Sequence, residues 1–382
     1  MIGKAEIAEV VDTLRSDWIT TGPKTEKFEG QFRKYVGAKG ALALDSCTAA
    51  LHLALAASGV GKGDAVITTP MTFCSGVNVI EHTGAQPVLA DIDPETMNID
   101  PRQVEKILRS KSMRKKVKAI IPVHFAGHPC DMAPLMRLAR KYGIKVIEDA
   151  AHALPAKYKG KMIGTIGDLT AFSFYATKNL TTAEGGMLTG RDKKLMERAR
   201  LLSLHGMSRD AWKRYSAAGS WYYEIIAPGF KYNMTDIQAA IGIHQLRRLG
   251  GFQKRRREIA AAYNQAFSKN AAFQIPASRR EVQHAWHLYV LRLNLKELKI
   301  DRARFIDELK RRGIGASVHF IPVHMHPYYR KKYGFKPADF PVAYREYQRT
   351  ISLPLYPRMT DADVRRVITA ATQIAKRYAR GK

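Results

Sequence analysis

The chain has 382 residues, of which 46% are hydrophobic and 25% are charged, values that argue for a globular protein and against a disordered one. Its 63 Lys and Arg residues against 34 Asp and Glu residues give a net charge of +29, which predicts attraction to polyanions or anionic substrates. Three distant cysteines without a CxxC pair argue against a disulfide framework or a structural zinc site and favour a reducing cytoplasm.

The first two hundred residues alternate between strand-like and helix-like patterns, which is typical of parallel βαβ units. Helical patterns such as CTAALHLALAASG and PRQVEKILRS separate the apolar runs. We therefore predict an α/β fold with a mostly parallel central sheet flanked by helices. Its strands are expected at 41–44, 65–69, 87–92, 118–125, 145–151, 169–175 and 186–190.

A long helical region begins near residue 234 and separates this sheet from a smaller unit. That unit is expected to contain a second sheet, with strands from AWHLYVLRL (285–293) and GASVHF (315–320), together with the helix RARFIDELKRRG and a closing helix near 361–379. We predict a large domain over 1–233, and a connecting helix with a small α+β domain over 234–382. Ligands of open parallel sheets bind outside the carboxyl ends of the strands, so residues that directly follow strands are candidates for chemistry.

Asp149 ends the most apolar of the predicted strands, in VIED. A buried carboxylate is costly unless a cation faces it, and a protonated pyridine nitrogen would be such a cation. An acid in that position keeps the ring protonated and able to accept electrons from a carbanion. The alternatives are that Asp149 caps the next loop or pairs with an arginine.

The segment DSCTAA (45–50) joins a strand to a helix through small residues. Such a segment allows backbone N–H groups at the helix start to hold an anion such as phosphate. Ser46 and Thr48 could also be ordinary helix N-caps. The sequence has no GxGxxG and no GxxxxGK[ST], which argues against a dinucleotide fold or a P-loop.

Lys178 lies between a short apolar run and a Thr/Glu/Gly turn in FSFYATKNLTTAEGG, and no acidic residue follows it until Glu184. Taken alone, it reads as a solvated surface lysine. Together with an acid at a strand end and a phosphate cup, it suits pyridoxal 5'-phosphate (PLP). The lysine would form a Schiff base with the cofactor aldehyde, which requires desolvation or a nearby cation to lower the pKa of the amine.

The order and wording of these motifs resemble the DegT/DnrJ/EryC1/StrS sugar aminotransferases, which are PLP-dependent enzymes of fold type I. The resemblance implies that fold for this chain. It covers nearly the whole sequence, through the blocks WITTGPKTEKFE, DSCTAALHLAL, PMTFCSGVNVI, VIEDAAHA, GDLTAFSFYATKNLTTAEGGML, FKYNMTDIQAAIG, HAWHLYV, SVHFIPVHMHPYY and SLPLYP.

The resemblance also implies roles for single residues. Lys178 matches the Schiff-base lysine and general acid/base, and Asp149 matches the partner of the pyridine nitrogen. His152 resembles the residue near the phenolic oxygen, and Phe73 resembles the aromatic stacked on the ring; a hydrogen-bonded loop histidine and a core phenylalanine are the alternatives. The residues implied in binding the cofactor phosphate are Ser173, Thr48 and Ala49.

Asn233 in KYNMTD matches an asparagine that reaches the phosphate from the neighbouring subunit, which implies a homodimer with shared active sites. Alternatively, Asn233 is the N-cap of the helix MTDIQAAIG, with Asp236 three residues later as a capping-box variant. His319 and His324 in VHFIPVH resemble substrate-side residues of related transaminases.

The histidine in EDAAHA resembles family members that act on C4 of the sugar, such as the transaminases for 4-amino-4-deoxy-L-arabinose and pseudaminic-acid precursors. The implied function is transfer of the amino group of glutamate to C4 of a nucleotide-diphosphate keto sugar, with release of 2-oxoglutarate, for a surface polysaccharide such as lipopolysaccharide. The rivals are a C3-acting transaminase, a sugar dehydratase, which would carry histidine in place of Lys178, and a regulatory or binding protein on the same scaffold.

The basic charge has three interpretations: a solvated surface, help with a phosphorylated substrate, or nucleic-acid binding. No helix-turn-helix signature, zinc-finger spacing or RNA-binding aromatic motif accompanies it, so we expect no nucleic-acid partner. No apolar run approaches the roughly 18 residues that span a bilayer, and the N-terminus predicts an amphipathic helix rather than a signal peptide. We therefore expect no membrane span, no metal and a cytoplasmic location.

Overall fold

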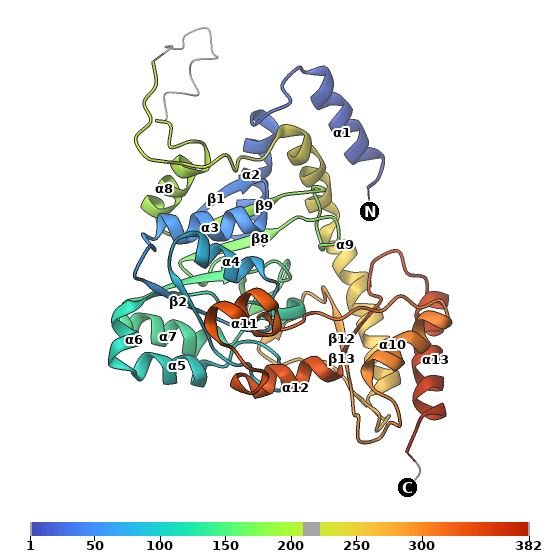
Figure 1. Ribbon diagram of the computed structural model, residues 1–382. Helices are drawn as coiled ribbons and strands as arrows, with labels where there is room; N and C mark the ends of the chain where they lie inside the picture. Colours follow the sequence, from blue (N-terminus) through green and yellow to red (C-terminus); the bar gives the residue numbers. More distant parts are fainter. Residues whose placement is uncertain (1, 209–221, 381–382) are drawn as a thin grey trace.

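A seven-stranded sheet forms the centre of the computed structural model, which describes residues 2–208 and 222–380 (Figure 1). The strand order is β1-β9-β8-β5-β4-β2-β3. Only β9 runs antiparallel to its neighbours, β1 and β8, and the other pairs are parallel. The predicted mostly parallel sheet is confirmed. Its strands are β1 (Gly40–Leu44), β2 (Ala65–Thr68), β3 (Gln86–Leu89), β4 (Val117–Ile120), β5 (Lys145–Asp149), β8 (Leu169–Ser173) and β9 (Gly186–Gly190).

Helices cover both faces of this sheet, because its strands carry apolar side chains on both faces. In β1, Leu42 and Leu44 pack with α3 and α8, whereas Ala41 and Ala43 belong to the core that includes α2, α5, α7 and the start of α9. The helices named here and their neighbours are α1 (Lys4–Arg15), α2 (Pro23–Val36), α3 (Cys47–Ala57), α4 (Ser75–His82), α5 (Pro101–Arg109), α6 (Lys111–Lys116), α7 (Met132–Tyr142), α8 (Lys193–Ser203) and α9 (Asp236–Phe267).

The long helix α9 contributes to two hydrophobic cores. Its first half, including Ile243 and Leu249, packs into the core of the large sheet, and its second half, including Tyr263 and Phe267, packs into a second core. The second core lies around a three-stranded sheet of order β10-β12-β13. The division of the chain at 233/234 stays a prediction. The elements of this part are β10 (Phe273–Gln274), β12 (Tyr289–Leu293), β13 (Thr350–Leu353), α10 (Arg302–Arg311), α11 (Pro327–Tyr333), α12 (Pro341–Arg349) and α13 (Asp361–Arg377).

Two details of the second half differ from the sequence reading. The segment 315–320 forms no regular strand, because only Ser317 pairs, through an isolated bridge with Ser352 of β13. The N-cap of α9 is Thr235, whose hydroxyl accepts a hydrogen bond from the N–H of Gln238 in a capping box. The alternative that Asn233 caps this helix is therefore wrong.

The first residue of α9, Asp236, ties that helix to the start of α2. Its buried carboxylate accepts hydrogen bonds from the N–H groups of Gly22 (2.8 Å), Lys24 (2.9 Å) and Thr25 (2.9 Å), and from the Thr25 hydroxyl (2.6 Å). These N–H groups have no partner within their own helix, so a carboxylate from elsewhere in the chain caps α2.

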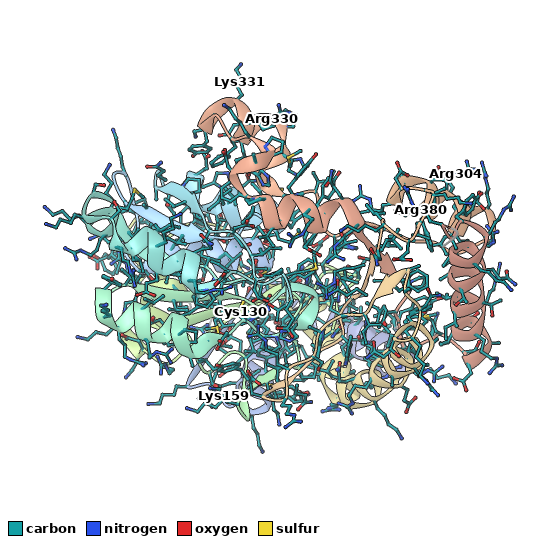
Figure 2. The ribbon with its side chains drawn as sticks, turned by 90° about the horizontal axis from the view of Figure 1, so that it is seen from below. Cys130, Lys159, Arg304, Arg330, Lys331 and Arg380 are labelled. Carbon is teal, nitrogen blue, oxygen red and sulfur yellow. The ribbon has the colours of Figure 1, made fainter. Side chains whose placement is uncertain are left out.

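Basic side chains lie at separate places on the surface. Figure 2 shows Arg330 and Lys331 projecting from α11, Arg304 and Arg380 near α10 and α13, and Lys159 on another side, while Cys130 lies inside. Across residues 2–208 and 222–380, no helix combines the length and the apolar composition that a membrane crossing needs.

Candidate active site

A cavity of about 530 Å³ opens where β5 and β8 end, next to the first turn of α3. It collects residues that are far apart in the sequence, as expected at the carboxyl ends of parallel strands. Those that the sequence singled out are Thr48, Phe73, Asp149, His152, Ser173, Lys178 and His319. The others that line it are Ser46, Cys47, Thr72, Ser75, Val123, Ala151, Tyr175, Thr177, Glu184, Gly185, His287 and Phe320.

Asp149 is the buried acidic group of the cavity, whereas Glu184 lies exposed at its edge. Its Oδ1 accepts a hydrogen bond from the N–H of Ala151 at 3.0 Å, so the loop-capping alternative describes part of its role. No arginine pairs with it within residues 2–208 and 222–380. Burial raises the pKa of this carboxyl, while the Ala151 N–H and the charge of Lys178 lower it. A cation next to this carboxylate would therefore be stabilised.

Lys178 is the basic group of the cavity, and its side chain is partly enclosed rather than a solvated surface lysine. A backbone turn from the Lys178 N–H to the carbonyl of Tyr175 (2.9 Å) positions it after β8. Burial lowers the pKa of the amine, against the opposing effects of Cys47 and Asp149. A lowered pKa increases the fraction of free amine, the form that attacks a carbonyl.

The first turn of α3 forms a small cup beside the lysine. Ser46 is the N-cap of α3, and its hydroxyl accepts a hydrogen bond from the N–H of Ala49 at 3.0 Å. The Ala49 N–H is thus already used, and its residue does not line the cavity, whereas the side chains of Thr48 and Ser173 do. The positive end of a helix together with hydroxyl groups suits a phosphate.

Gly186, the first residue of β9, lies directly against this cup. A Cβ at Gly186 would stand 2.4 Å from the carbonyl carbon of Ser46 and 2.6 Å from the nitrogen of Cys47. Real Cβ contacts do not come that close. The absence of a side chain at this position therefore permits the close approach of β9 and α3.

Aromatic and imidazole rings form one wall. The rings of His152 and His287 have centroids 4.4 Å apart, and His152 stacks on Phe320 at 5.8 Å with planes 18° apart. Burial lowers the pKa of both histidines well below the usual range, so both are neutral at pH 7. Phe73 is 60% exposed, which rules out the core-phenylalanine alternative.

The two histidines predicted on the substrate side lie in different surroundings. His319 lines the cavity and shares a 2.8 Å hydrogen bond between its Nδ1 and the hydroxyl of Ser352. His324 has no exposed surface, packs against Phe340, and does not line this cavity. The geometry favours a packing role for His324.

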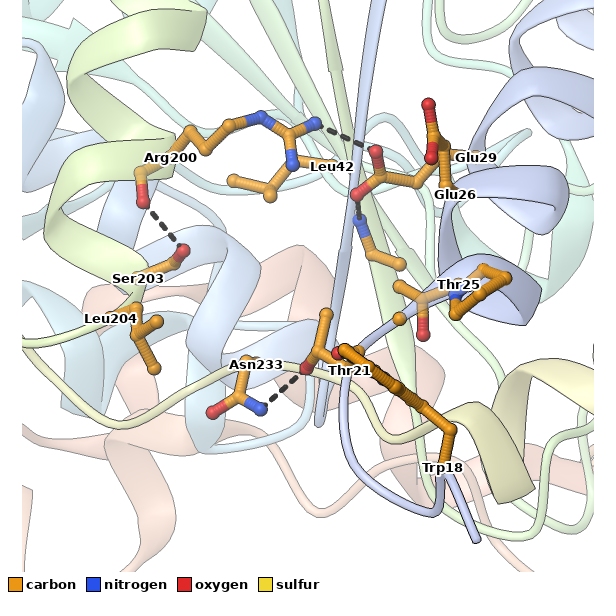
Figure 3. A pocket seen from close by; sticks show the side chains of 13 residues that line it. Trp18, Thr21, Thr25, Glu26, Glu29, Leu42, Arg200, Ser203, Leu204 and Asn233 are labelled. Atoms are coloured by element: carbon orange, nitrogen blue, oxygen red, sulfur yellow. Dashed lines mark hydrogen bonds and ion pairs between the residues drawn. The ribbon is translucent and has the colours of Figure 1, made fainter. Parts of the chain in front are cut away.

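Asn233 lies at a separate cavity of about 510 Å³ (Figure 3). Its amide donates a hydrogen bond to the hydroxyl of Thr21 at 2.6 Å, and Trp18 lies beside them. On the other side of this cavity, Arg200 pairs with Glu29 at 2.7 Å. Asn233 therefore does not join Lys178 within one copy of the chain.

The residues around Lys178 fit PLP. The volume suits a small cofactor, and the buried Nδ1 of His152 has no hydrogen-bond partner among the described residues, as expected for a polar atom that faces a ligand. The sequence reading missed His287 and Phe320, although both lie in the quoted blocks HAWHLYV and SVHFIPVHMHPYY. It also assigned no role to Cys47.

Known proteins match the chain over its length. At 55% identity it is similar to the spore coat polysaccharide biosynthesis protein SpsC of Bacillus subtilis, over 98% of this chain and 96% of that protein. Spr1654 of Streptococcus pneumoniae, described as a sugar aminotransferase and solved in its PMP form, superposes with a TM-score of 0.92 at 37% identity, covering 99% and 98% of the two chains. The same protein is solved in its PLP form.

PseC of Helicobacter pylori, an aminotransferase involved in the biosynthesis of pseudoaminic acid, superposes with a TM-score of 0.90 at 27% identity, covering 99% of this chain and 98% of PseC. These neighbours confirm the predicted fold class. The model of the DegT/DnrJ/EryC1/StrS aminotransferase family matches residues 1–372. The chain therefore belongs to the DegT/DnrJ/EryC1/StrS aminotransferase family, which is PLP-dependent.

Proposed function

We propose that this protein is a sugar aminotransferase that transfers the amino group of L-glutamate to C4 of a nucleotide-diphosphate keto sugar and releases 2-oxoglutarate. The observation that carries the proposal is the meeting of the Lys178 amine, the Asp149 carboxylate and the first turn of α3 in one cavity. The similarity to SpsC and PseC supports a sugar acceptor and a role in surface polysaccharide synthesis.

Lys178 and Asp149 are the catalytic pair in this proposal. PLP, when bound, supplies an electron sink for the bonds at the amino-acid Cα. Lys178, whose pKa burial lowers, takes the proton from Cα and later returns a proton to the carbon that receives the amine. Asp149, buried and held by the Ala151 N–H, keeps a proton on the pyridine nitrogen in both half-reactions.

The cup binds the cofactor phosphate through the hydroxyls of Thr48 and Ser173 and the N-terminus of α3. Phe73, exposed at the cavity rim, would stack on the cofactor ring, and His152, buried in the cavity wall, would lie near its phenolic oxygen. His319 faces the substrate. The contributions predicted for Ala49 and His324 stay predictions, because neither residue lines the cavity.

A homodimer would complete the site with Asn233 of the second copy. Trp18, which lines the Asn233 cavity, is 41% exposed and its chain neighbour Ile19 is 51% exposed, and apolar surface of this kind supports a subunit contact. Cys47, Cys74 and Cys130 are all free thiols, which suits a reducing cytoplasm.

Position C4 rests on His152 in EDAAHA, the feature shared with C4-acting relatives. A C3-acting enzyme is the second candidate. A sugar dehydratase is disfavoured because the lysine that such enzymes replace with histidine is present as Lys178.

The decisive experiment incubates the PLP-loaded enzyme with glutamate and a panel of UDP-, GDP- and dTDP-linked 4-keto and 3-keto sugars and measures product masses. A 4-amino product supports the proposal, and a 3-amino product would move the reaction to C3. Glutamate alone is expected to shift the visible absorption of the bound cofactor to the near ultraviolet. A glutamate response that survives in Lys178→Ala would contradict the role of this lysine.

A further inference from the structure

Asn179, the residue after Lys178, has an amide whose orientation is fixed by two carbonyl groups. Its Nδ2 donates hydrogen bonds to the carbonyls of Leu154 (2.9 Å) and Ala285 (3.0 Å). Both amide hydrogens are thereby used, and the reverse orientation would place the Oδ1 against two carbonyl oxygens. The Oδ1 of Asn179 can therefore act only as an acceptor.

That acceptor determines the tautomer of His287. The Nδ1 of His287 lies 3.2 Å from the Oδ1 of Asn179 and must carry the hydrogen. A neutral imidazole has only one N–H, so the Nε2 of His287 presents a lone pair. Burial keeps this ring neutral by lowering its pKa, with contributions from His152, Lys178, Arg256 and His319.

The backbone of His287 is fixed as well. Its N–H donates to the carbonyl of Ala126 at 3.0 Å, and its carbonyl accepts from Arg256 Nη1 at 3.1 Å. Because His287 lines the cavity and its Nδ1 points to Asn179, the Nε2 is the polar atom that remains for a ligand. The neighbouring His152 ring, 4.4 Å away, restricts the ring on its other side.

We propose that His287 is a specificity residue whose Nε2, held as an acceptor by Asn179, receives a hydrogen bond from a hydroxyl of the amino-acceptor substrate. The inference rests on the proposed function and deepens it, because a polyhydroxy ketone offers hydroxyl donors next to the reacting carbon. A fixed acceptor rejects a substrate that presents another acceptor at that point. Within the cavity, the ammonium form of Lys178 is a competing donor, and the experiment separates the two.

Two substitutions separate the two functions of the His287 ring, which are the hydrogen bond from Nδ1 to Asn179 and the acceptor at Nε2. His287→Asn retains a donor at the position of Nδ1 and can still bond Asn179, but it removes the acceptor from the cavity. His287→Gln reaches the position of Nε2 with an amide oxygen, but it loses the bond to Asn179. His82→Asn, on α4 and outside the cavity lining, is the matched control.

We expect kcat/KM for the keto sugar that the wild type uses to fall about tenfold in His287→Asn, mainly through KM, and less in His287→Gln. The fall should exceed that in the glutamate half-reaction, which stopped-flow absorbance measures separately. Equal losses in both half-reactions would assign the Nε2 to Lys178 and overturn the proposal. Wild-type kinetics in His287→Asn would also overturn the proposal.

A second measurement needs no substrate. In the cofactor-free protein, ¹⁵N NMR at pH 7 should show His287 with a protonated Nδ1 and an unprotonated Nε2, and the signal is assigned by its loss in His287→Asn. Protonation of Nε2 would overturn the inference. If the wild type aminates no keto sugar while the NMR result holds, the proposed function fails and the assignment of the acceptor atom stands.

Discussion

Replacement of Asp236 tests whether the link between α9 and α2 stabilises the protein. The carboxylate accepts four hydrogen bonds of 2.6–2.9 Å, three of them from backbone N–H groups at the start of α2. A hydrogen bond to a charged group contributes about 1.5–3 kcal/mol, and such contributions add incompletely. Gly22 and Lys24 are partly exposed, so water can replace the carboxylate there more easily than at the buried Thr25.

We therefore expect Asp236→Ala to lower the free energy of unfolding by about 4 kcal/mol, and Asp236→Asn by about 2 kcal/mol because the amide oxygen still accepts. Thr25→Ala removes only the hydroxyl contact of 2.6 Å and should cost about 1.5 kcal/mol. Urea unfolding followed by circular dichroism, at one protein concentration and with saturating PLP, measures all three. A change below about 0.5 kcal/mol in Asp236→Asn would refute the reasoning.

Three further predictions concern the cavity and its surroundings. Asp149→Asn retains the contact with the Ala151 N–H but loses the negative charge. We expect turnover to fall about 100-fold while the absorbance of the bound cofactor persists. Unchanged turnover would contradict the role of Asp149 as the partner of the pyridine nitrogen. In cofactor-free protein, acetylation of Lys178 should reach half its maximal rate below pH 10.5, because burial lowers the pKa of the amine. Mass spectrometry measures the acetylation rate, with the peptide that contains the exposed Lys331 as the control. A midpoint at or above pH 10.5 for Lys178 would contradict the lowered pKa. Burial lowers the pKa of His324 in the folded protein to about 4. Between pH 6.5 and 4 the unfolded chain therefore binds more protons at this residue than the folded chain does, and the protein loses stability as the pH decreases. In urea unfolding, His324→Leu should reduce the stability that is lost between pH 8 and pH 5 by about 1 to 2 kcal/mol. Identical pH profiles of stability for the variant and the wild type would contradict this role of His324.

The large sheet was predictable because its strands carry local signals. Apolar runs bounded by helical patterns placed β5 and β8, and the rule for parallel sheets then placed Asp149 and Lys178 at one edge. The segment 315–320 was harder, because its pattern suits a strand but does not say whether a partner lies beside it, and only Ser317 finds one.

Long-range contacts explain what the sequence did not reveal. His287 depends on Asn179, 108 residues earlier in the chain, and within an apolar run it reads as a core histidine. Asp236 reads as part of a helix cap, but its carboxylate bonds Thr25, 211 residues away. No local pattern records such pairs, because each residue is ordinary in its own segment.

The bare backbone at Gly186 has a consequence for evolution of this site. Even a methyl group there would overlap the peptide between Ser46 and Cys47, so α3 would have to retreat from the sheet. Any retreat would change the distance between the first turn of α3 and the amine of Lys178. Gly186, which does not line the cavity itself, thus sets how close β9 and α3 can lie and with it the length of the cavity between them.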